Sequence, residues 1–334
     1  MMPSATATNL LWDAHSNLPL EPGREVDDLL EHRRHGFGFV SINVGYDPAP
    51  LEEIMRSIAW FREAIDAQPG LTLVGTLDEL EEAYRSGLLA VAFDLEGALC
   101  LLEEPSMVAL WAHLGVRQMH LAYNRNNWAA DGCYDKARGL TPAGRAMVQA
   151  LNAAGIMVDC SHGGERSTLE IMAASSRPVV FSHACAAAIH PHPRNVSDRQ
   201  IRACAESGGV IGIVGYSRFL GATPSRAEDM VRHMVHVAEL VGAEHVGIGW
   251  DYGYPARKSD PMGAVADFDW WFPDASRNRQ EGLTPEQVFT PLSEAQRLPH
   301  LLEDAGFSGA EIHCILRGNF ERVARATWPG SCAS

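Results

Sequence analysis

The chain lacks the features that mark membrane, nucleic-acid-binding and exported proteins. No apolar run in its 334 residues approaches the roughly 18 residues needed to span a bilayer. Its 27 Lys and Arg are outnumbered by 42 Asp and Glu, and the resulting net charge of −15 repels phosphate backbones. Residues 1–9 contain neither a basic segment nor an apolar core, which argues against a signal peptide. We therefore expect no membrane insertion, no nucleic-acid partner and no export.

Paired cysteines and domain linkers are also missing. The seven cysteines form an odd set without paired spacing, which fits free thiols in a reducing cytoplasm better than a disulfide framework. No internal repeat, low-complexity tract or Pro/Gly-rich linker divides the chain, and 334 residues fall within the range of one α/β barrel. We expect a cytoplasmic protein with a single domain over residues 1–334.

Short apolar runs rich in β-branched residues alternate with segments of helical periodicity along most of the chain. Each run is too short for a helix and ends in polar groups; they lie at 9–15, 37–45, 89–95, 117–123, 155–162, 177–183, 208–215 and 245–249. A further run at 71–75 is interpreted as an accessory strand. Strands alternating with helices in this way predict an α/β fold, a parallel (β/α)8 barrel of the TIM type.

The alternation stops after Asp251. Residues 252–291 are rich in Pro, Gly and Asp, and they include an aromatic segment at 267–273. We interpret residues 252–291 as an irregular insertion whose aromatic segment serves as a lid, an interface anchor or part of an irregular core. Helical periodicity returns from Pro291 to Trp328, which predicts C-terminal helices packed on the outside of the barrel.

Two of the runs end in the dipeptide Ser-His, at His162 and His183, with a helical segment over 165–175 between them. Strand, helix and strand in this order predict parallel neighbours, so both imidazoles should lie at the same C-terminal edge of the barrel. That edge is where α/β barrels place their active sites, and two histidines there suggest a shared metal ion. The alternative is a pair of hydrogen-bonded loop histidines without a ligand.

Other strand ends add further polar residues of the same kind. They contribute His15 and Asn17 from the first strand, Glu96 from the third, Tyr123 from the fourth and Asp251 from the eighth. Imidazole and carboxylate are the usual ligands of Zn²⁺, and a carboxylate between two histidine-bearing strands can bridge two ions. Glu96 or Asp251 alone could be a solvated loop acid, but chance rarely places such a set at successive strand ends. The pattern predicts a binuclear metal-dependent hydrolase, in which a bridging water has its pKa lowered towards ~7.

Several sequence motifs resemble those of the membrane (renal) dipeptidase family of zinc peptidases, which are amidohydrolase-type barrel enzymes. They lie, in the family's order, at 13–19 (Asp-Ala-His-Ser-Asn-Leu-Pro), 95–97, 140–144, 159–162 (Asp-Cys-Ser-His), 178–183, 193–196, 247–251 and 318–323. Together they cover nearly the whole chain. The resemblance implies hydrolysis of small dipeptides with a free C-terminal carboxylate, L-Xaa-D-Xaa among them, by a homodimer.

The same resemblance implies two zinc ions and assigns their ligands. The first ion would be bound by His15, Glu96 and Asp251, and the second by Glu96, His162 and His183, with Glu96 as the bridge. Asp251 would also transfer the proton of the attacking water to the leaving amine. Arg194 falls on the family's arginine that clamps the substrate carboxylate, a task suited to a planar bidentate donor.

Two residues depart from the family's pattern. Asn17 replaces an aspartate ligand, and because an amide is a neutral and weaker ligand, the occupancy of the first site is left open. Tyr123 replaces a histidine that contacts the scissile carbonyl oxygen, and its phenol could donate the same hydrogen bond without carrying imidazolium charge. Two other functions therefore stay open: hydrolysis of a non-peptide amide or lactam, and a barrel that has lost activity and acts as a binding protein.

Other histidines and cysteines are assigned to packing. His120 precedes Tyr123 by three residues on the same predicted strand, so its side chain should point to the opposite face of the sheet. His233 and His236 lie on a helix without a metal-binding pattern, and Cys160 and Cys185 are small packing residues beside the motifs.

Overall fold

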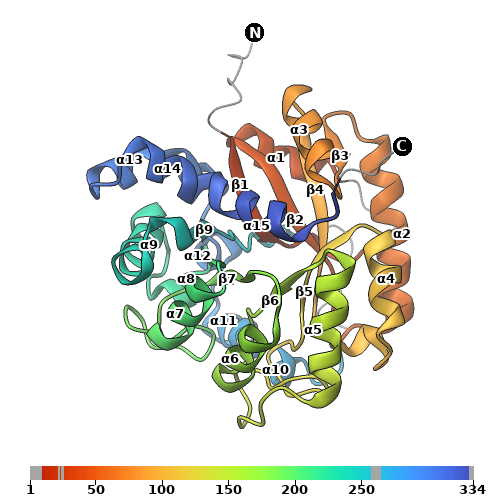
Figure 1. Ribbon diagram of the computed structural model, residues 1–334. Coiled ribbons are helices and arrows are strands. Elements are labelled where there is room, and N and C mark those ends of the chain that lie inside the picture. Colours follow the sequence, from red (N-terminus) through yellow and green to blue (C-terminus); the bar gives the residue numbers. More distant parts are fainter. Residues whose placement is uncertain (1–9, 22, 24–25, 257–264, 331–334) are drawn as a thin grey trace.

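Eight parallel strands form the barrel in the computed structural model, which describes residues 10–21, 23, 26–256 and 265–330. In chain order they are β1 (Leu11–Ser16), β2 (Phe37–Tyr46), β4 (Leu89–Glu96), β5 (Val116–His120), β6 (Met157–Asp159), β7 (Val179–Ala184), β8 (Val210–Ile213) and β9 (Val246–Ile248). Each pairs with the next (Figure 1), and the short β3 (Leu71–Leu73) pairs with the first residues of β4. The predicted (β/α)8 barrel, including its accessory strand, is confirmed.

The segment after β9 closes the barrel against β1. The backbone N–H of Asp251 donates to the carbonyl oxygen of His15 at 2.7 Å, and that of Asn17 donates to the carbonyl of Tyr252 at 2.9 Å. The N–H of Tyr254 donates to the carbonyl oxygen of Asn17, also at 2.9 Å. This ladder brings Asp251 beside His15, although the two residues are far apart in the sequence.

Helices surround the barrel and alternate with its strands (Figure 1). The ring consists of α2 (Leu51–Ala67), α3 (Leu77–Arg85), α4 (Ser106–His113), α5 (Pro142–Ala154), α6 (Glu165–Ala174), α7 (Asp198–Glu206) and α9 (Ala227–Val241). Shorter helices are α1 (Leu30–Arg34), α8 (Ser217–Leu220), α10 (Phe268–Trp271), α11 (Pro273–Glu281), α12 (Pro285–Val288), α13 (Leu298–Asp304), α14 (Gly309–His313) and α15 (Asn319–Thr327). Within the described residues, no helix is both long and apolar enough to cross a membrane.

Local sequence signals explain where two of these helices begin. Thr76 caps α3 by accepting the backbone N–H of Glu79 at 3.3 Å, and the Glu79 carboxylate accepts the N–H of Thr76 in return. Pro142 occupies the first turn of α5, where its missing N–H costs nothing, and the hydroxyl of Thr141 accepts from Gly144 N at 2.9 Å. Both helix starts agree with the sequence.

An aromatic layer fills the N-terminal end of the barrel. Trp12 of β1 stacks on Phe39 of β2 with ring centroids 3.7 Å apart, and Phe320 of α15 stacks on Trp12 at 6.2 Å. Trp328, which follows α15, contacts both Trp12 and Phe39. Burying an aromatic side chain contributes roughly 1.5–3 kcal/mol, so this layer is a stable base for the barrel. The interior above it is polar and contains the buried side chains of Ser41, Asn43, Asp94, Gln118, His120, Asp159 and Ser182.

Candidate metal centre

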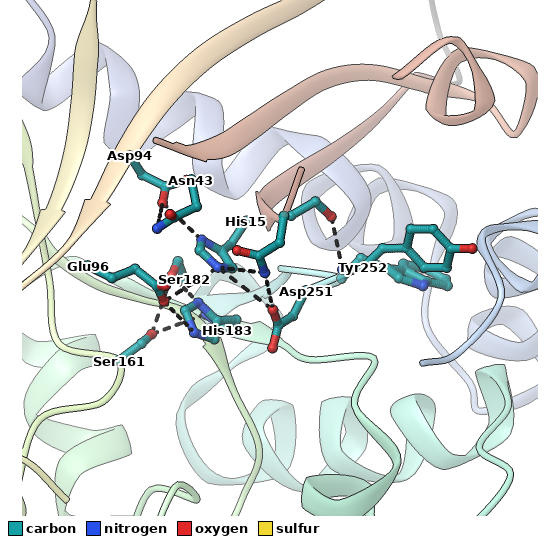
Figure 2. A network of polar contacts seen from close by, with 12 residues as sticks. His15, Asn43, Asp94, Glu96, Ser161, Ser182, His183, Asp251 and Tyr252 are labelled. Atoms are coloured by element: carbon teal, nitrogen blue, oxygen red, sulfur yellow. Dashed lines mark hydrogen bonds and ion pairs between the residues drawn. The ribbon is translucent and has the colours of Figure 1, made fainter. Parts of the chain in front are cut away.

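Three histidines converge on the carboxylate of Glu96 at the C-terminal end of the barrel. Oε1 of Glu96 lies 3.0 Å from Nε2 of His162, 3.5 Å from Nε2 of His15 and 3.6 Å from Nε2 of His183. All four side chains are buried, and each comes from the end of a different strand. Figure 2 shows His15, Glu96 and His183 pointing toward one another. Parallel strand ends on one rim therefore bring these four residues together.

Asp251 and Asn17 complete the cluster on the side of His15. Oδ1 of Asp251 lies 3.7 Å from Nε2 of His15. The amide nitrogen of Asn17 donates to the same Asp251 oxygen at 2.7 Å and lies 3.4 Å from Nε2 of His15. All six residues singled out as ligands thus form one group, but Asn17 turns its nitrogen, not its oxygen, toward the others.

The outer ring nitrogen of each histidine contacts a buried polar group. The partners are Asn124 Oδ1 for His162 at 2.7 Å, Ser182 Oγ for His183 at 2.8 Å and Asp94 Oδ1 for His15 at 3.1 Å. An amide oxygen can only accept, so His162 carries its proton on Nδ1 and its Nε2 lone pair faces the cluster. Outer partners of this kind orient metal-binding imidazoles.

This donor set fits a divalent metal ion. The Nε2 atoms of His162 and His183 lie only 2.9 Å apart, and two facing lone pairs at this distance repel each other without a cation or a shared proton. His15, Glu96 and His183 offer three ligand atoms within 4.8 Å of one another. Imidazole nitrogen and carboxylate oxygen are ligands that Zn²⁺ prefers. The residues present can therefore hold zinc.

Burial changes the protonation of the cluster. It raises the pKa of Glu96 to about 7 and that of Asp251 to about 6, because a buried carboxylate is costly to ionise. It lowers the pKa of His162 and His183 well below the usual value, which keeps both imidazoles neutral and able to bind a metal. Burial also opposes ionisation of His15, but the neighbouring carboxylates outweigh it and raise its pKa to about 10.

The backbone is strained at three residues of the site. Asn124, His162 and Asp251 have φ angles of +61°, +66° and +56°, a left-handed conformation that is uncommon outside glycine. Each such residue costs on the order of 1–3 kcal/mol and persists only when its surroundings hold it. The carbonyl oxygen of His162 accepts from Cys133 N at 2.9 Å, and that of Asn124 accepts from Tyr134 N at 3.0 Å. These bonds hold the strained turns that direct the side chains into the site.

A pocket of about 420 Å³ opens beside the cluster, lined in part by Glu96, Asp251, His162, Tyr123 and Arg194. The ring of Tyr123 stacks on His162 with centroids 4.4 Å apart. Arg194 is 4% exposed; its guanidinium lies over Phe219 and donates to the carbonyl of His183 at 3.4 Å. Its Nε has no hydrogen-bond partner among the described residues. A buried cation with an unpaired N–H beside the pocket is suited to an anionic group.

The aromatic segment 267–273 forms part of the wall of this pocket. Phe272 is buried and packs against Tyr46 and Tyr123, with ring centroids 5.7 Å away in both cases. Phe268 packs on Phe272 at 5.0 Å, whereas Trp270 is 46% exposed. Part of the predicted irregular insertion, residues 257–264, lies outside the described residues.

The expectation that His120 points away from the site is wrong. β5 ends at His120, not at Tyr123, so the alternation of side chains along a strand does not relate these two residues. His120 is fully buried inside the barrel, with Nδ1 3.9 Å from Oε1 of Glu96 and Nε2 2.8 Å from Oδ2 of Asp159. It therefore lies directly beneath the candidate metal centre.

The remaining histidines and cysteines agree with the packing assignment. His233 accepts the backbone N–H of Ala186 at 3.1 Å, and His236 contacts Asp198 at 2.8 Å. Cys160 and Cys185 are buried free thiols. None of these four residues is among the groups of possible metal ligands found in the described part of the chain.

Sequence comparisons find a family model and curated relatives that match this chain. Residues 28–270 match the family model described as membrane dipeptidase, peptidase family M19. Among relatives, the chain is 35% identical over 186 residues to "Dipeptidase tcpJ" of Claviceps purpurea. The aligned region covers 54% of this chain and 44% of that protein. The chain thus spans about half the length of the curated relatives that it matches first.

Solved structures share the fold. An amidohydrolase from Pseudomonas aeruginosa superposes with a TM-score of 0.83 at 23% identity, covering 96% of this chain and 97% of the other. A second structure is a metallo peptidase from Rhodobacter sphaeroides, liganded with a phosphinate mimic of the dipeptide L-Ala-D-Ala. It superposes with a TM-score of 0.76 at 20% identity, covering 96% of this chain and 99% of the other. Because the family model matches more than half of the chain, the chain belongs to the membrane dipeptidase family, peptidase family M19.

Proposed function

We propose that the protein is a zinc-dependent dipeptidase acting on small dipeptides with a free C-terminal carboxylate, L-Xaa-D-Xaa among them. The observation that supports this most is the convergence of imidazoles on Glu96 beside a pocket that contains the buried, partly unpaired Arg194. The proposed ligands are His15, Glu96 and Asp251 for a first site, with Asn17 beside them, and Glu96, His162 and His183 for a second site.

The chain's own residues divide the remaining chemistry. When bound, the zinc ions polarise the scissile carbonyl and lower the pKa of a water molecule. Asp251 accepts the proton of the attacking water and passes it to the leaving amine. Tyr123 donates its O–H to the oxygen that becomes negative; burial raises the pKa of this phenol well above its usual value, so the proton is retained. Arg194 pairs with the free carboxylate of the substrate.

The substrate class has two supports. The pocket volume of about 420 Å³ suits a small molecule better than an extended chain. The structurally similar metallo peptidase of Rhodobacter sphaeroides was solved with a mimic of L-Ala-D-Ala. We infer that L-Ala-L-Ala and L-Ala-D-Ala are both suitable first substrates.

The test is an assay of the purified protein after removal of metal and again after addition of zinc. The panel contains L-Ala-L-Ala, L-Ala-D-Ala, their C-terminal amides, a tripeptide and a β-lactam, with Glu96→Gln as the inactive control. We expect zinc-dependent hydrolysis of the free dipeptides only. Preferred hydrolysis of the lactam would replace the proposed substrate class, and zinc binding without hydrolysis of any compound would indicate a binding protein.

Assembly and location are part of the same proposal. The homodimer rests on the tendency of the family, together with the exposed side chains of Leu99, Leu102 and Leu110. The cytoplasmic location rests on the cysteines, all free among the described residues, and the single domain on the missing linker. Light scattering on the purified protein tests the dimer directly.

A further inference from the structure

A buried aspartate beneath the second site holds two strand ends at once. Oδ1 of Asp159, at the end of β6, accepts the backbone N–H of Ser161 at 2.9 Å and that of Ser182 at 3.1 Å. Ser161 directly precedes His162, and Ser182 directly precedes His183; Figure 2 shows the two serines beside His183. One carboxylate oxygen therefore sets the spacing of the two histidine-bearing backbones.

Asp13 has the same arrangement beneath the first site. Its Oδ1 accepts the backbone N–H of Trp250 at 2.7 Å and that of His15 at 3.2 Å. Trp250 directly precedes Asp251, so this carboxylate links the backbones of His15 and Asp251. The two halves of the proposed metal centre are thus each held by one buried aspartate.

A fully buried histidine faces the other carboxylate oxygen of each aspartate. Nε2 of His120 lies 2.8 Å from Oδ2 of Asp159, and Nε2 of His32 lies 2.8 Å from Oδ2 of Asp13. Nδ1 of His32 also contacts the hydroxyl of Tyr254 at 2.6 Å. Neither histidine belongs to the proposed ligand set, and the sequence motifs assign no role to either.

We infer that His120 and His32 are positioning residues for the metal ions, His120 acting through Asp159 on the second site and His32 acting through Asp13 on the first. This inference rests on the proposed metal centre. Without the imidazole, Oδ2 loses a polar partner inside a barrel that excludes water, so the carboxylate must turn or recruit water. The N–H groups on Oδ1 would then shift, and with them the ligand backbones that follow.

The two pairs differ in how much support remains after removal of the histidine. Oδ2 of Asp13 also accepts the hydroxyl of Ser16 at 2.6 Å. Oδ2 of Asp159 contacts only His120 among the polar partners in the described part of the chain. We therefore expect a larger effect from loss of His120 than from loss of His32.

The experiment titrates metal-free protein with Zn²⁺ against a chromophoric chelator, and with Co²⁺ to follow the ligand-field spectrum. His120→Leu should weaken the second site about 10–100-fold, the usual effect of losing an outer partner of a ligand, and leave the first site within about threefold. His32→Leu should weaken Zn²⁺ binding at the first site, but by a smaller factor than His120→Leu weakens binding at the second. His120→Gln and His32→Gln, which keep an N–H donor, should restore most of the affinity and the cobalt spectrum.

Background variants assign each affinity to its site. His162→Ala retains only the first site, and His15→Ala only the second. His233→Leu, which removes a buried histidine outside the centre, controls for general loss of packing and should leave both affinities unchanged. If His120→Leu does not fold, His120→Asn, which is too short to reach Asp159, replaces it.

Unchanged affinities in folded His120→Leu would overturn the inference, as would equal weakening of both sites in step with the loss of thermal stability. A wild type that binds no metal would overturn the inference and the proposed function together. Normal metal binding and the expected site-selective losses without peptide hydrolysis would refute the proposed function and leave the inference standing.

Discussion

Asn17 stands where the family's pattern has an aspartate, and its amide contributes no negative charge to the proposed metal centre. Its amide nitrogen lies 2.7 Å from Oδ1 of Asp251 and 3.4 Å from Nε2 of His15, so the N–H groups, and not the amide oxygen, face the proposed ligands of the first site. To ligate through oxygen, the amide must turn and give up its hydrogen bond to Asp251. We therefore expect the first site to bind zinc more weakly than the second.

Restoring the carboxylate tests this difference. Asn17→Asp should raise the zinc retained per chain after dialysis against a weak chelator, because the added charge attracts the cation. Asn17→Ala, which removes the amide without adding charge, is the matched control and should not raise it. Two tightly held ions in the wild type, unchanged by Asn17→Asp, would show that another group supplies the missing ligand.

We expect Arg194 to bind the free C-terminal carboxylate of the substrate. Arg194→Ala should lower kcat/KM for a dipeptide. The drop should correspond to a loss of ~2 kcal/mol or more of transition-state stabilisation, the usual cost of losing one partner of a desolvated charge pair. Arg194→Lys keeps the charge but not the bidentate geometry and should be intermediate. The measurement compares a dipeptide with its C-terminal amide on all three proteins. Equal treatment of the two compounds by the wild type would remove Arg194 from this role.

At the scale of elements, one wall of the pocket depends on two segments distant in sequence. The four-residue α10 is too short to be stable alone, and its carbonyls accept from the loop after β5. Asn124 Nδ2 donates to Trp271 O at 2.8 Å, and Arg125 Nε donates to Trp270 O at 2.7 Å. These bonds place Phe272 against Tyr123 beside the cluster.

Phe272 should therefore favour substrates with large apolar side chains. Phe272→Ala is expected to lower kcat/KM for L-Phe-L-Ala severalfold more than for L-Ala-L-Ala, because only the larger substrate reaches the aromatic wall. Trp270→Ala changes an exposed aromatic of the same helix and should affect both substrates little. An equal loss for both dipeptides in Phe272→Ala would mean that the phenylalanine only supports the fold.

The elements differ in how far the sequence predicts them. Strands such as β7 are apolar, β-branched runs that end in a polar pair, and period and composition place them to within about two residues. β5 ends early because the chain turns after His120, although the apolar character continues through Leu121 and Ala122. α10 has no such local signal, since its position depends on hydrogen bonds to residues about 145 positions earlier.

For the whole molecule, the topology explains which site residues the sequence reveals. Side chains at the ends of parallel strands share one rim, so Glu96, His162 and His183 can be grouped once the barrel is predicted. His120 and His32 cannot be found in this way, because their roles arise from contacts with Asp159 and Asp13 inside the barrel. Such contacts between distant positions leave no periodic signal in a single sequence.

A buried group of acids and histidines should also make the metal-free protein sensitive to pH. In the folded chain the pKa of His15 is raised from 6.5 to about 10, and that of Glu96 is raised from 4.5 to about 7. From pH 7 to 9, the unfolded chain has lost the protons of both groups, whereas the folded chain still holds the proton of His15. The folded state binds more protons, so its stability must fall as the pH rises.

We therefore expect the free energy of unfolding of chelator-treated protein to decrease between pH 7 and 9, by up to about 1.4 kcal/mol per pH unit for one proton. Zinc takes the place of that proton, because a ligating imidazole must be neutral, so the zinc-loaded protein should show a smaller slope. Denaturant unfolding at pH 7, 8 and 9, with and without zinc, measures both slopes. His15→Gln has no titrating imidazole at this position and should lose the part of the metal-free slope that the proton of His15 contributes. Buried cysteines such as Cys100, whose pKa burial raises, add a decrease near pH 9 that is common to both forms and cancels in the comparison. Identical slopes with and without zinc would show that the proton at His15 is not what the metal replaces.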